Sequence, residues 1–246
     1  MSNLVRLERW GTTYRAVKFL HSGLGERKQT QRQKRDPEDL SEEEKSERFE
    51  QSVSRSRSRV RELALCNEWE YFATFTLCDE KQDRFDLKTF VKDLGNWIGN
   101  YNKKYGTKLK YLIIPEQHKN GAWHAHGLLH NVASDSLVHN MYGYLDMPYY
   151  AQRFGYISLS PIKDRNKCAT YISKYITKDT AATSAALGSG YHSFYSSRGL
   201  EGRAFVCQGF LDDFECDHYN DFVGTKFLNE EEAERLVNEI LGGENS

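Results

Sequence analysis

The stretch Tyr111–His130, YLIIPEQHKNGAWHAHGLLH, predicts two strands joined by a tight turn. At its centre the dipeptide Asn120-Gly121 separates two apolar runs, which is a strong signal for a β-hairpin. Successive side chains point to opposite faces of a strand, so we expect His124 and His126 on one face. Two imidazoles placed in this way can bind a divalent metal if a carboxylate joins them.

The length of the turn decides whether Glu116 supplies that carboxylate. A two-residue turn would place Glu116 opposite Ala125, on the other face of the hairpin. A three-residue connection would pair Glu116 with His126 and His118 with His124, and would bring all four to one side. Both lengths occur in hairpins, so the sequence leaves both open, with a solvent-facing polar strand as the alternative to a metal site.

Composition indicates a cytoplasmic protein without membrane association. The chain has 246 residues, of which 39% are hydrophobic, and a mean hydropathy of −0.73. No apolar run approaches the roughly 20 residues of a membrane span, and the N-terminus has no signal-peptide pattern. Its five cysteines are odd in number and never form a C-x-x-C pair, which argues against a disulfide framework and a zinc knuckle.

Charge is distributed unevenly along the chain. Residues 210–246 carry a net charge of −9, which leaves +8 for residues 1–209 of a chain whose net charge is −1. The basic part could hold a phosphate backbone. A serine-arginine run supplies four candidate DNA-binding residues, although a solvated helix face would carry the same residues: Arg55, Arg57, Arg59 and Arg61.

Apolar periodicity predicts an α+β fold, with a central antiparallel sheet and flanking helices. Strands are expected over 70–77, 110–116, 122–130 and 155–160, with two further strands over 192–197 and 203–208. Helices are expected after a capping box at Ser41, after caps at Asp86 and Asn229, and over 164–178. The small residues 181–190 suggest a lid or hinge, and the polar, basic residues 25–39 suggest a linker.

The segment Asp164–Lys178, DRNKCATYISKYITK, combines tyrosine with lysine. At about 100° per residue, Tyr171, Lys174, Tyr175 and Lys178 share one stripe of the expected helix. Tyrosine is a poor nucleophile at neutral pH unless a cation stabilises the phenolate or the reacting phosphate. With a metal nearby, these side chains suit attack on a phosphodiester, whereas two packing tyrosines with solvated lysines are the alternative.

Together these residues resemble the HUH endonuclease superfamily, and within it the rolling-circle replication initiators of small bacterial plasmids and single-stranded DNA phages. Phe72–Leu77 (FATFTL) resembles the threonine-rich first motif, and Trp123–Leu129 (WHAHGLL) resembles the His-hydrophobic-His second motif. Tyr171–Lys178 (YISKYITK) resembles the third motif in its two-tyrosine form, and Glu116 matches the acidic ligand that many initiators place on the preceding strand. The resemblance covers roughly residues 55–180.

The resemblance implies a ferredoxin-like catalytic domain that nicks and rejoins single-stranded origin DNA. A divalent metal, Mg²⁺ or Mn²⁺, would lie on His124, His126 and Glu116, with Gln117 or a more distant residue as the third ligand if Glu116 points away. His118 would be an extra ligand or a bystander.

The same resemblance implies how the tyrosines act. One tyrosine would attack the scissile phosphate, become linked to the DNA 5′ end and leave a 3′-OH that primes synthesis. Tyr171 with Lys174 and Tyr175 with Lys178 both fit the family's Y-x-x-K unit, so the sequence does not rank them.

The resemblance also suggests an organisation and partners. We divide the chain into an N-terminal segment with linker (1–40), the catalytic domain (41–210) and an acidic C-terminal segment with a terminal helix (211–246). The G-x-x-x-x-G-K-[ST] pattern is absent, so helicase and polymerase would come from the bacterial host, in whose cytoplasm the protein would act. Four tyrosines are candidates for base stacking, with core packing as the alternative: Tyr142, Tyr144, Tyr149 and Tyr150.

Other functions stay open on the sequence alone. A relaxase or an HUH transposase would use the same chemistry, a non-catalytic origin- or RNA-binding domain would keep the fold, and a small-molecule metalloenzyme would use only the histidine pair.

Overall fold

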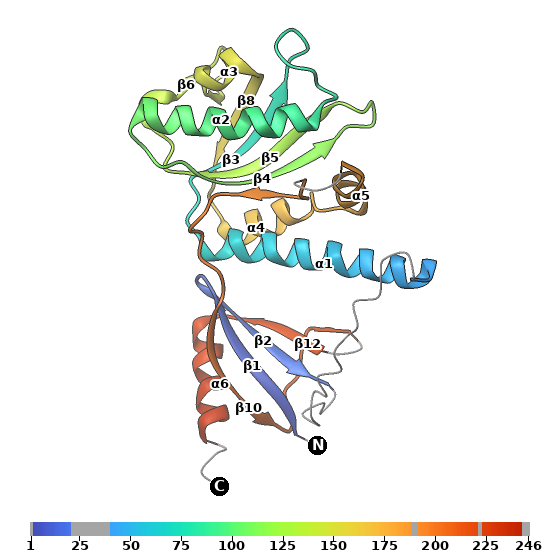
Figure 1. Ribbon diagram of the computed structural model, residues 1–246. Coiled ribbons are helices and arrows are strands. Elements are labelled where there is room, and N and C mark those ends of the chain that lie inside the picture. The colour runs from blue at the N-terminus through green and yellow to red at the C-terminus, as the bar shows by residue number, and fades with distance from the viewer. Residues whose placement is uncertain (1, 21–39, 188–190, 221–222, 243–246) are drawn as a thin grey trace. The chain divides into compact units, whose positions relative to one another are not determined.

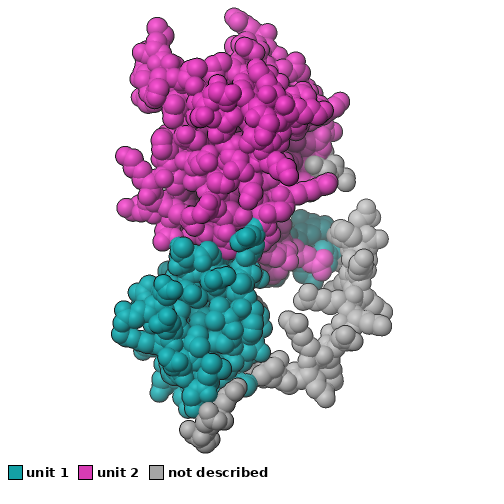
Figure 2. All heavy atoms as spheres, turned by 90° about the vertical axis from the view of Figure 1, so that its left-hand side faces the viewer, with its two compact units in different colours: residues 1–47, 201–246 teal, residues 48–200 magenta. Residues whose placement is uncertain are grey.

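The computed structural model of the chain describes residues 2–20, 40–187, 191–220 and 223–242. The linker expected over 25–39 and the last residues of the expected lid, 188–190, lie outside these ranges. Two compact units are present, one formed by residues 48–200 and the other by residues 1–47 together with 201–246 (Figure 2). In the described residues each unit contains one antiparallel sheet with helices, so the expected α+β class is confirmed.

The larger unit is built on a seven-stranded sheet with the order β6-β7-β8-β3-β5-β4-β9, counted over the described residues. Its strands are β3 (Tyr71–Leu77), β4 (Lys110–Gln117), β5 (Trp123–His130), β6 (Val138–His139), β7 (Leu145–Asp146), β8 (Gly155–Pro161) and β9 (Tyr195–Ser196). Its helices are α1 (Glu42–Cys66, from residue 48 on), α2 (Leu87–Tyr105), α3 (Pro148–Arg153), α4 (Arg165–Ser173) and α5 (Lys178–Leu187), with a 3₁₀ turn at Ser134–Ser136.

One face of this sheet carries the main apolar core. Ala73 and Phe75 of β3 and Ala125 of β5 point to this face, where they pack with apolar residues of α2 and α3. Figure 1 shows α2 and α3 on this side, and α4 and α1 on the other. Because side chains alternate along a strand, the residues between these core positions point toward α4 and α1. The histidines of β5 are among them.

The caps predicted from the sequence are present at the helix starts. The Ser41 hydroxyl accepts from the Glu44 amide at 3.2 Å, and the Glu44 carboxylate accepts from the Ser41 amide at 3.0 Å, which completes the capping box of α1. The Asp86 carboxylate accepts from the Thr89 amide at 3.1 Å at the start of α2. A reciprocal pair at Asn229 starts the last helix in the same way.

The tyrosine segment differs from its prediction. The helix expected over 164–178 starts as predicted, with Asp164 accepting from the Lys167 amide at 3.0 Å, but it ends at Ser173. A short connection follows, and α5 then begins at Lys178. Residues 181–187 therefore lie in a helix, and the expectation of a lid or hinge was wrong for them.

The smaller unit joins segments from both ends of the chain. Among the described residues its sheet has the order β10-β1-β2-β12-β11, and α6 packs on one face. Its elements are β1 (Asn3–Trp10), β2 (Thr13–Phe19), β10 (Ala204–Leu211), β11 (His218–Tyr219), β12 (Val223–Leu228) and α6 (Glu230–Gly242). The strand expected over 203–208 is present as β10, but it pairs with β1, so the larger unit ends at residue 200 whereas the expected domain ran to 210.

Within the part of the chain that the structure describes, no helix combines the length and the apolar character needed to cross a membrane.

Candidate metal and nucleophile site

The β4–β5 hairpin has an odd-numbered turn. The His118 amide donates to the Ala122 carbonyl and the Gly121 amide donates to the His118 carbonyl, both at 2.8 Å. Gly121 closes this three-residue loop with φ of 87°, a conformation that glycine adopts without strain. The connection runs from Lys119 to Gly121, one residue earlier than the sequence suggested, so Glu116 pairs with His124 and not with His126 as expected.

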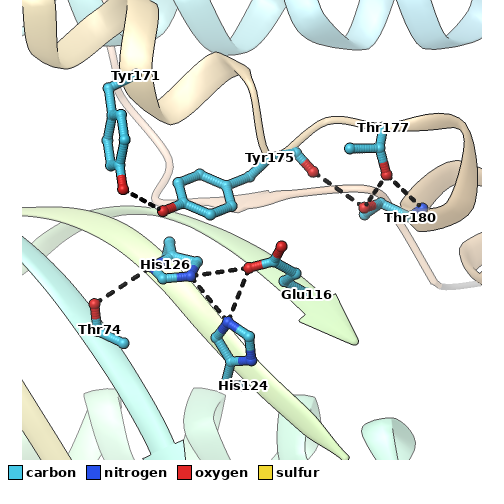
Figure 3. A network of polar contacts seen from close by, with 8 residues as sticks. All are labelled: Thr74, Glu116, His124, His126, Tyr171, Tyr175, Thr177 and Thr180. Carbon is cyan, nitrogen blue, oxygen red and sulfur yellow. Dashed lines mark hydrogen bonds and ion pairs between the residues drawn. The ribbon is translucent and has the colours of Figure 1, made fainter. Parts of the chain in front are cut away.

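The odd turn brings Glu116, His124 and His126 to one face of the sheet (Figure 3). Glu116 Oε2 lies 2.8 Å from His124 Nε2 and 3.0 Å from His126 Nε2, and the two imidazole nitrogens are 2.9 Å apart. Both histidines are buried, whereas Glu116 is partly exposed. The three atoms therefore form a nearly equilateral triangle at the bottom of an accessible site.

This triangle has the size of one face of an octahedral metal site. Ligands of an octahedral ion at about 2.1 Å lie about 3.0 Å from one another, which matches the three measured edges. Two imidazoles and one carboxylate on a single face leave the remaining positions of such an ion for other ligands. The donor set thus fits a divalent cation. His118 lies beside His124, with ring centroids 3.8 Å apart, but it does not belong to the converging group.

Burial keeps the two imidazoles neutral. It lowers the pKa of His126 to about 4, helped by the neighbouring His124, and it also lowers the pKa of His124. A neutral imidazole has a lone pair to offer to a metal. Thr74 of β3 lies opposite His126, and its hydroxyl is 3.3 Å from His126 Nδ1, which orients the ring from behind.

Tyr175 lies directly over this cluster. It belongs to the connection between α4 and α5, and its ring stacks on His126 with 3.9 Å between centroids and 21° between planes. Its hydroxyl donates to the Tyr171 hydroxyl at 2.8 Å (Figure 3). Burial, the hydrogen bond to Tyr171 and the nearby Glu116 charge all raise the pKa of Tyr175, so this phenol stays protonated without a cation beside it.

Tyr171 occupies a different position. It projects from α4 and is 50% exposed, and its ring contacts Phe72 at a centroid distance of 5.4 Å. Phe72 also contacts His126, at 5.8 Å. The two tyrosines are therefore joined by one hydrogen bond, but Tyr175 is the one stacked on the histidine cluster.

Three contacts hold the connection that carries Tyr175. The Arg57 guanidinium donates twice to the Ile176 carbonyl, at 2.8 and 3.2 Å. The Thr180 hydroxyl donates to the Tyr175 carbonyl at 3.0 Å (Figure 3). Lys178 bonds Glu50 of α1 at 2.5 Å. Arg57 and Thr180 were not predicted for this role, because no local sequence pattern links them to the tyrosines.

The predicted lysines do not share one helix face. Lys178 is engaged with Glu50 through the contact just described, and it lowers the pKa of that carboxylate. Lys174 is exposed at the end of α4, on the side of Tyr171. The expected stripe of two tyrosines and two lysines is broken because the helix ends between Tyr171 and Tyr175.

The predicted arginines and aromatics also separate into groups. Arg57 holds the Tyr175 connection, Arg59 bonds Glu62 at 2.6 Å, and burial lowers the pKa of Arg61, while Arg55 is exposed. Among the candidate stacking residues, Tyr142 and Tyr144 are exposed, whereas Tyr150 is fully buried and Tyr149 stacks on Trp97.

Comparison with known proteins identifies one family. Residues 70–180 match the family model described as a replication-associated protein of the ORF2 type, a family of rolling-circle replication initiators. The matched range contains the metal-binding candidates and both tyrosines, and it confirms the resemblance inferred from the motifs. No curated protein and no solved structure matches the chain.

Proposed function

We propose that the unit formed by residues 48–200, which contains the region matched to replication initiators, is a metal-dependent nickase and strand transferase that starts rolling-circle replication. Its substrate is single-stranded DNA at a replication origin. One observation carries the proposal: a tyrosine hydroxyl and a cluster of two imidazoles and one carboxylate lie on the same face of the sheet, with the tyrosine ring stacked on one imidazole.

His124, His126 and Glu116 hold the metal. When bound, Mg²⁺ or Mn²⁺ supplies positive charge that polarises the scissile phosphate and stabilises the departing oxygen. The buried, neutral imidazoles and the partly exposed carboxylate leave the site open on the side of Tyr175. Thr74 keeps the ring of His126 in the orientation that presents Nε2 to the metal.

Tyr175 is the first nucleophile. Its oxygen forms a bond to the scissile phosphorus while the bond from phosphorus to O3′ breaks, which yields a 5′-phosphotyrosine and a 3′-OH. The phenolic proton leaves along the hydrogen bond to Tyr171, whose half-exposed side chain connects it to solvent, and O3′ gains a proton. Tyr171 attacks in the second transfer, which cuts the new junction so that the strands can be rejoined.

A covalent adduct tests this proposal. The protein is incubated with Mn²⁺ and single-stranded DNA from its own replicon, and the products are separated on a denaturing gel. We expect a protein–DNA adduct that disappears with EDTA and in Glu116→Gln, and that persists in the control Tyr142→Phe, whose side chain is 76% exposed. Failure to form an adduct with this DNA in the presence of either Mn²⁺ or Mg²⁺ would refute the proposal.

The same experiment separates the alternatives. A non-catalytic origin- or RNA-binding domain would bind nucleic acid without an adduct, and a small-molecule metalloenzyme would bind metal without either. A relaxase or a transposase would form the adduct with transfer-origin or transposon-end DNA and not with the replication origin. The stacking of Tyr175 on His126 favours the enzymes that use a tyrosine nucleophile.

A further inference from the structure

A cavity of about 710 Å³ lies beside Tyr171, on the opposite side of this tyrosine from the metal-binding candidates. It is bounded by the end of β8, by the loop that follows and by the exposed side of α4. Its volume falls within the range of roughly 300–1000 Å³ that is usual for small-molecule sites. We refer to it as the α4 cavity. No step proposed above uses it.

The charges around the α4 cavity are mainly positive. Lys163, Lys167 and Lys174 line it, against the single carboxylate of Asp164. That carboxylate caps α4 by accepting from the Lys167 amide, and its other oxygen lies 3.3 Å from Lys167 Nζ. All three lysines are exposed, and an exposed ion pair of this kind is weak, so their ammonium groups are available to a phosphate.

Aromatic rings form the wall of the cavity nearest to the proposed reaction. Phe72 and Tyr171 both line it, and Phe72 contacts His126 and Tyr175 on its other side, at centroid distances of 5.8 and 6.5 Å. A single ring thus separates the α4 cavity from the metal and nucleophile site. Aromatic walls with a cationic rim are the combination that holds unpaired nucleotides, through base stacking and phosphate contacts.

We propose that the α4 cavity binds one unpaired nucleotide of the DNA strand next to the scissile phosphate, with its base against Phe72 and Tyr171 and its phosphate on Lys163 and Lys167. This inference rests on the proposed function, because it takes the scissile phosphate to lie under Tyr175. It adds a site outside the three sequence motifs: the loop from Pro161 to Asp164 and the start of α4 anchor the substrate at a fixed distance from the nucleophile.

Binding without metal tests the inference apart from catalysis. Fluorescein-labelled dT20 is titrated with the full chain in EDTA at several salt concentrations, and anisotropy gives the affinity. The variant Lys163→Ala/Lys167→Ala removes two phosphate contacts, and we expect it to bind roughly tenfold more weakly, with a salt slope lower by about 1.4. The control Lys92→Ala/Lys103→Ala removes two exposed lysines of α2, on the other face of the sheet, and should change the affinity by less than about twofold.

A second probe tests the base. An oligonucleotide of the same length with abasic sugars keeps the phosphates, and we expect the wild-type chain to bind it more weakly than dT20 because the aromatic wall loses its partner. Equal binding of dT20 by the two double variants, or equal binding of the two oligonucleotides by the wild type, would overturn the inference. Either result leaves the adduct experiment unaffected, so failure of the cavity and failure of the nickase can be told apart.

Discussion

Tyr175 stacks on His126 although the two residues lie in different elements, the connection after α4 and the strand β5, and their rings are only 3.9 Å apart. Tyr171, which the sequence could not distinguish from Tyr175, contacts Phe72 at 5.4 Å and reaches the cluster through its hydrogen bond to the Tyr175 hydroxyl. The two tyrosines of the motif are therefore not equivalent in position, and their roles should differ.

Replacing each tyrosine should separate the two transfers. In Tyr175→Phe the first adduct should fall to roughly one-hundredth of the wild-type yield or less, because the oxygen beside the metal site is lost. In Tyr171→Phe the first adduct should form, and rejoining of the strand to a second substrate should fail. Adduct yield and rejoined product on denaturing gels measure the two steps. A normal first adduct in Tyr175→Phe would reverse the assignment.

Removing Arg57 should displace Tyr175 without touching the metal ligands. Arg57 donates two hydrogen bonds to the Ile176 carbonyl, next to the nucleophile, and hydrogen bonds from a charged group contribute about 1.5–3 kcal/mol. We expect Arg57→Ala to lower the unfolding free energy by an amount in that range and to reduce adduct yield, while Mn²⁺ affinity is unchanged. Urea unfolding, gels and calorimetry provide the three readouts.

Arg55→Ala is the matched control for Arg57, because Arg55 lies two residues away on the same helix and is exposed. It should retain stability and adduct yield. Equal losses in both variants would mean that the positive charge of α1 matters and that the contact with Ile176 does not.

The Thr74 hydroxyl should affect metal binding through His126. Residues that orient a metal-binding histidine commonly change metal affinity by about 10–100-fold when they are replaced. We expect Thr74→Val, which keeps the shape of the side chain and removes the hydroxyl, to weaken Mn²⁺ binding by a factor in this range. Thr74→Ser keeps the hydroxyl and should restore affinity. Isothermal titration with Mn²⁺ measures both, and a Thr74→Val chain that binds Mn²⁺ normally would exclude this role.

Two glycines of the larger unit should respond in opposite directions to alanine. Gly155 begins β8 with φ of 148°, and a Cβ there would lie 2.7 Å from the Cys78 amide nitrogen and 2.9 Å from the Thr76 carbonyl oxygen. Gly155→Ala should therefore destabilise the fold by roughly 1–3 kcal/mol. Gly99 lies inside α2, where a Cβ would meet nothing within 4 Å, so Gly99→Ala should stabilise the fold by about 0.8–1 kcal/mol. Urea midpoints give the sign of each change.

The sequence determines the parity of the β4–β5 turn only when the site itself is considered. Asn120-Gly121 locates the turn, but turns of two and three residues suit it equally. The requirement that Glu116 reach the histidines selects the odd length. It cannot select between two odd lengths shifted by one residue, because both place Glu116 on the same face. The pairing of Glu116 with His124 is set by the positive φ of Gly121 and the bonds between His118 and Ala122.

The end of α4 shows why other parts could not be predicted. Asp164 marks the start of this helix by a local rule, and the structure follows it. The sequence after Tyr171 contains no glycine or proline to mark the end, and helical periodicity continues to Lys178. The helix nevertheless ends at Ser173, where the Ile176 carbonyl beyond it is bound by Arg57, which is 119 residues away in sequence. Contacts of this kind depend on the folded arrangement and leave no local pattern.

Pairing between β1 and β10 also makes the two units differ in when they can form on the ribosome. β1 ends at Trp10, and its partner β10 begins at Ala204, so the first strand is synthesised roughly 10–40 s before its neighbour at about 5–20 residues per second. All strands of the larger sheet precede β10 in the chain. The nickase unit can therefore complete its sheet during translation, while one edge of β1 waits unpaired. A pause in elongation before Ala204 would prolong the exposure of that edge, which makes translation speed in this region relevant to aggregation of the nascent protein.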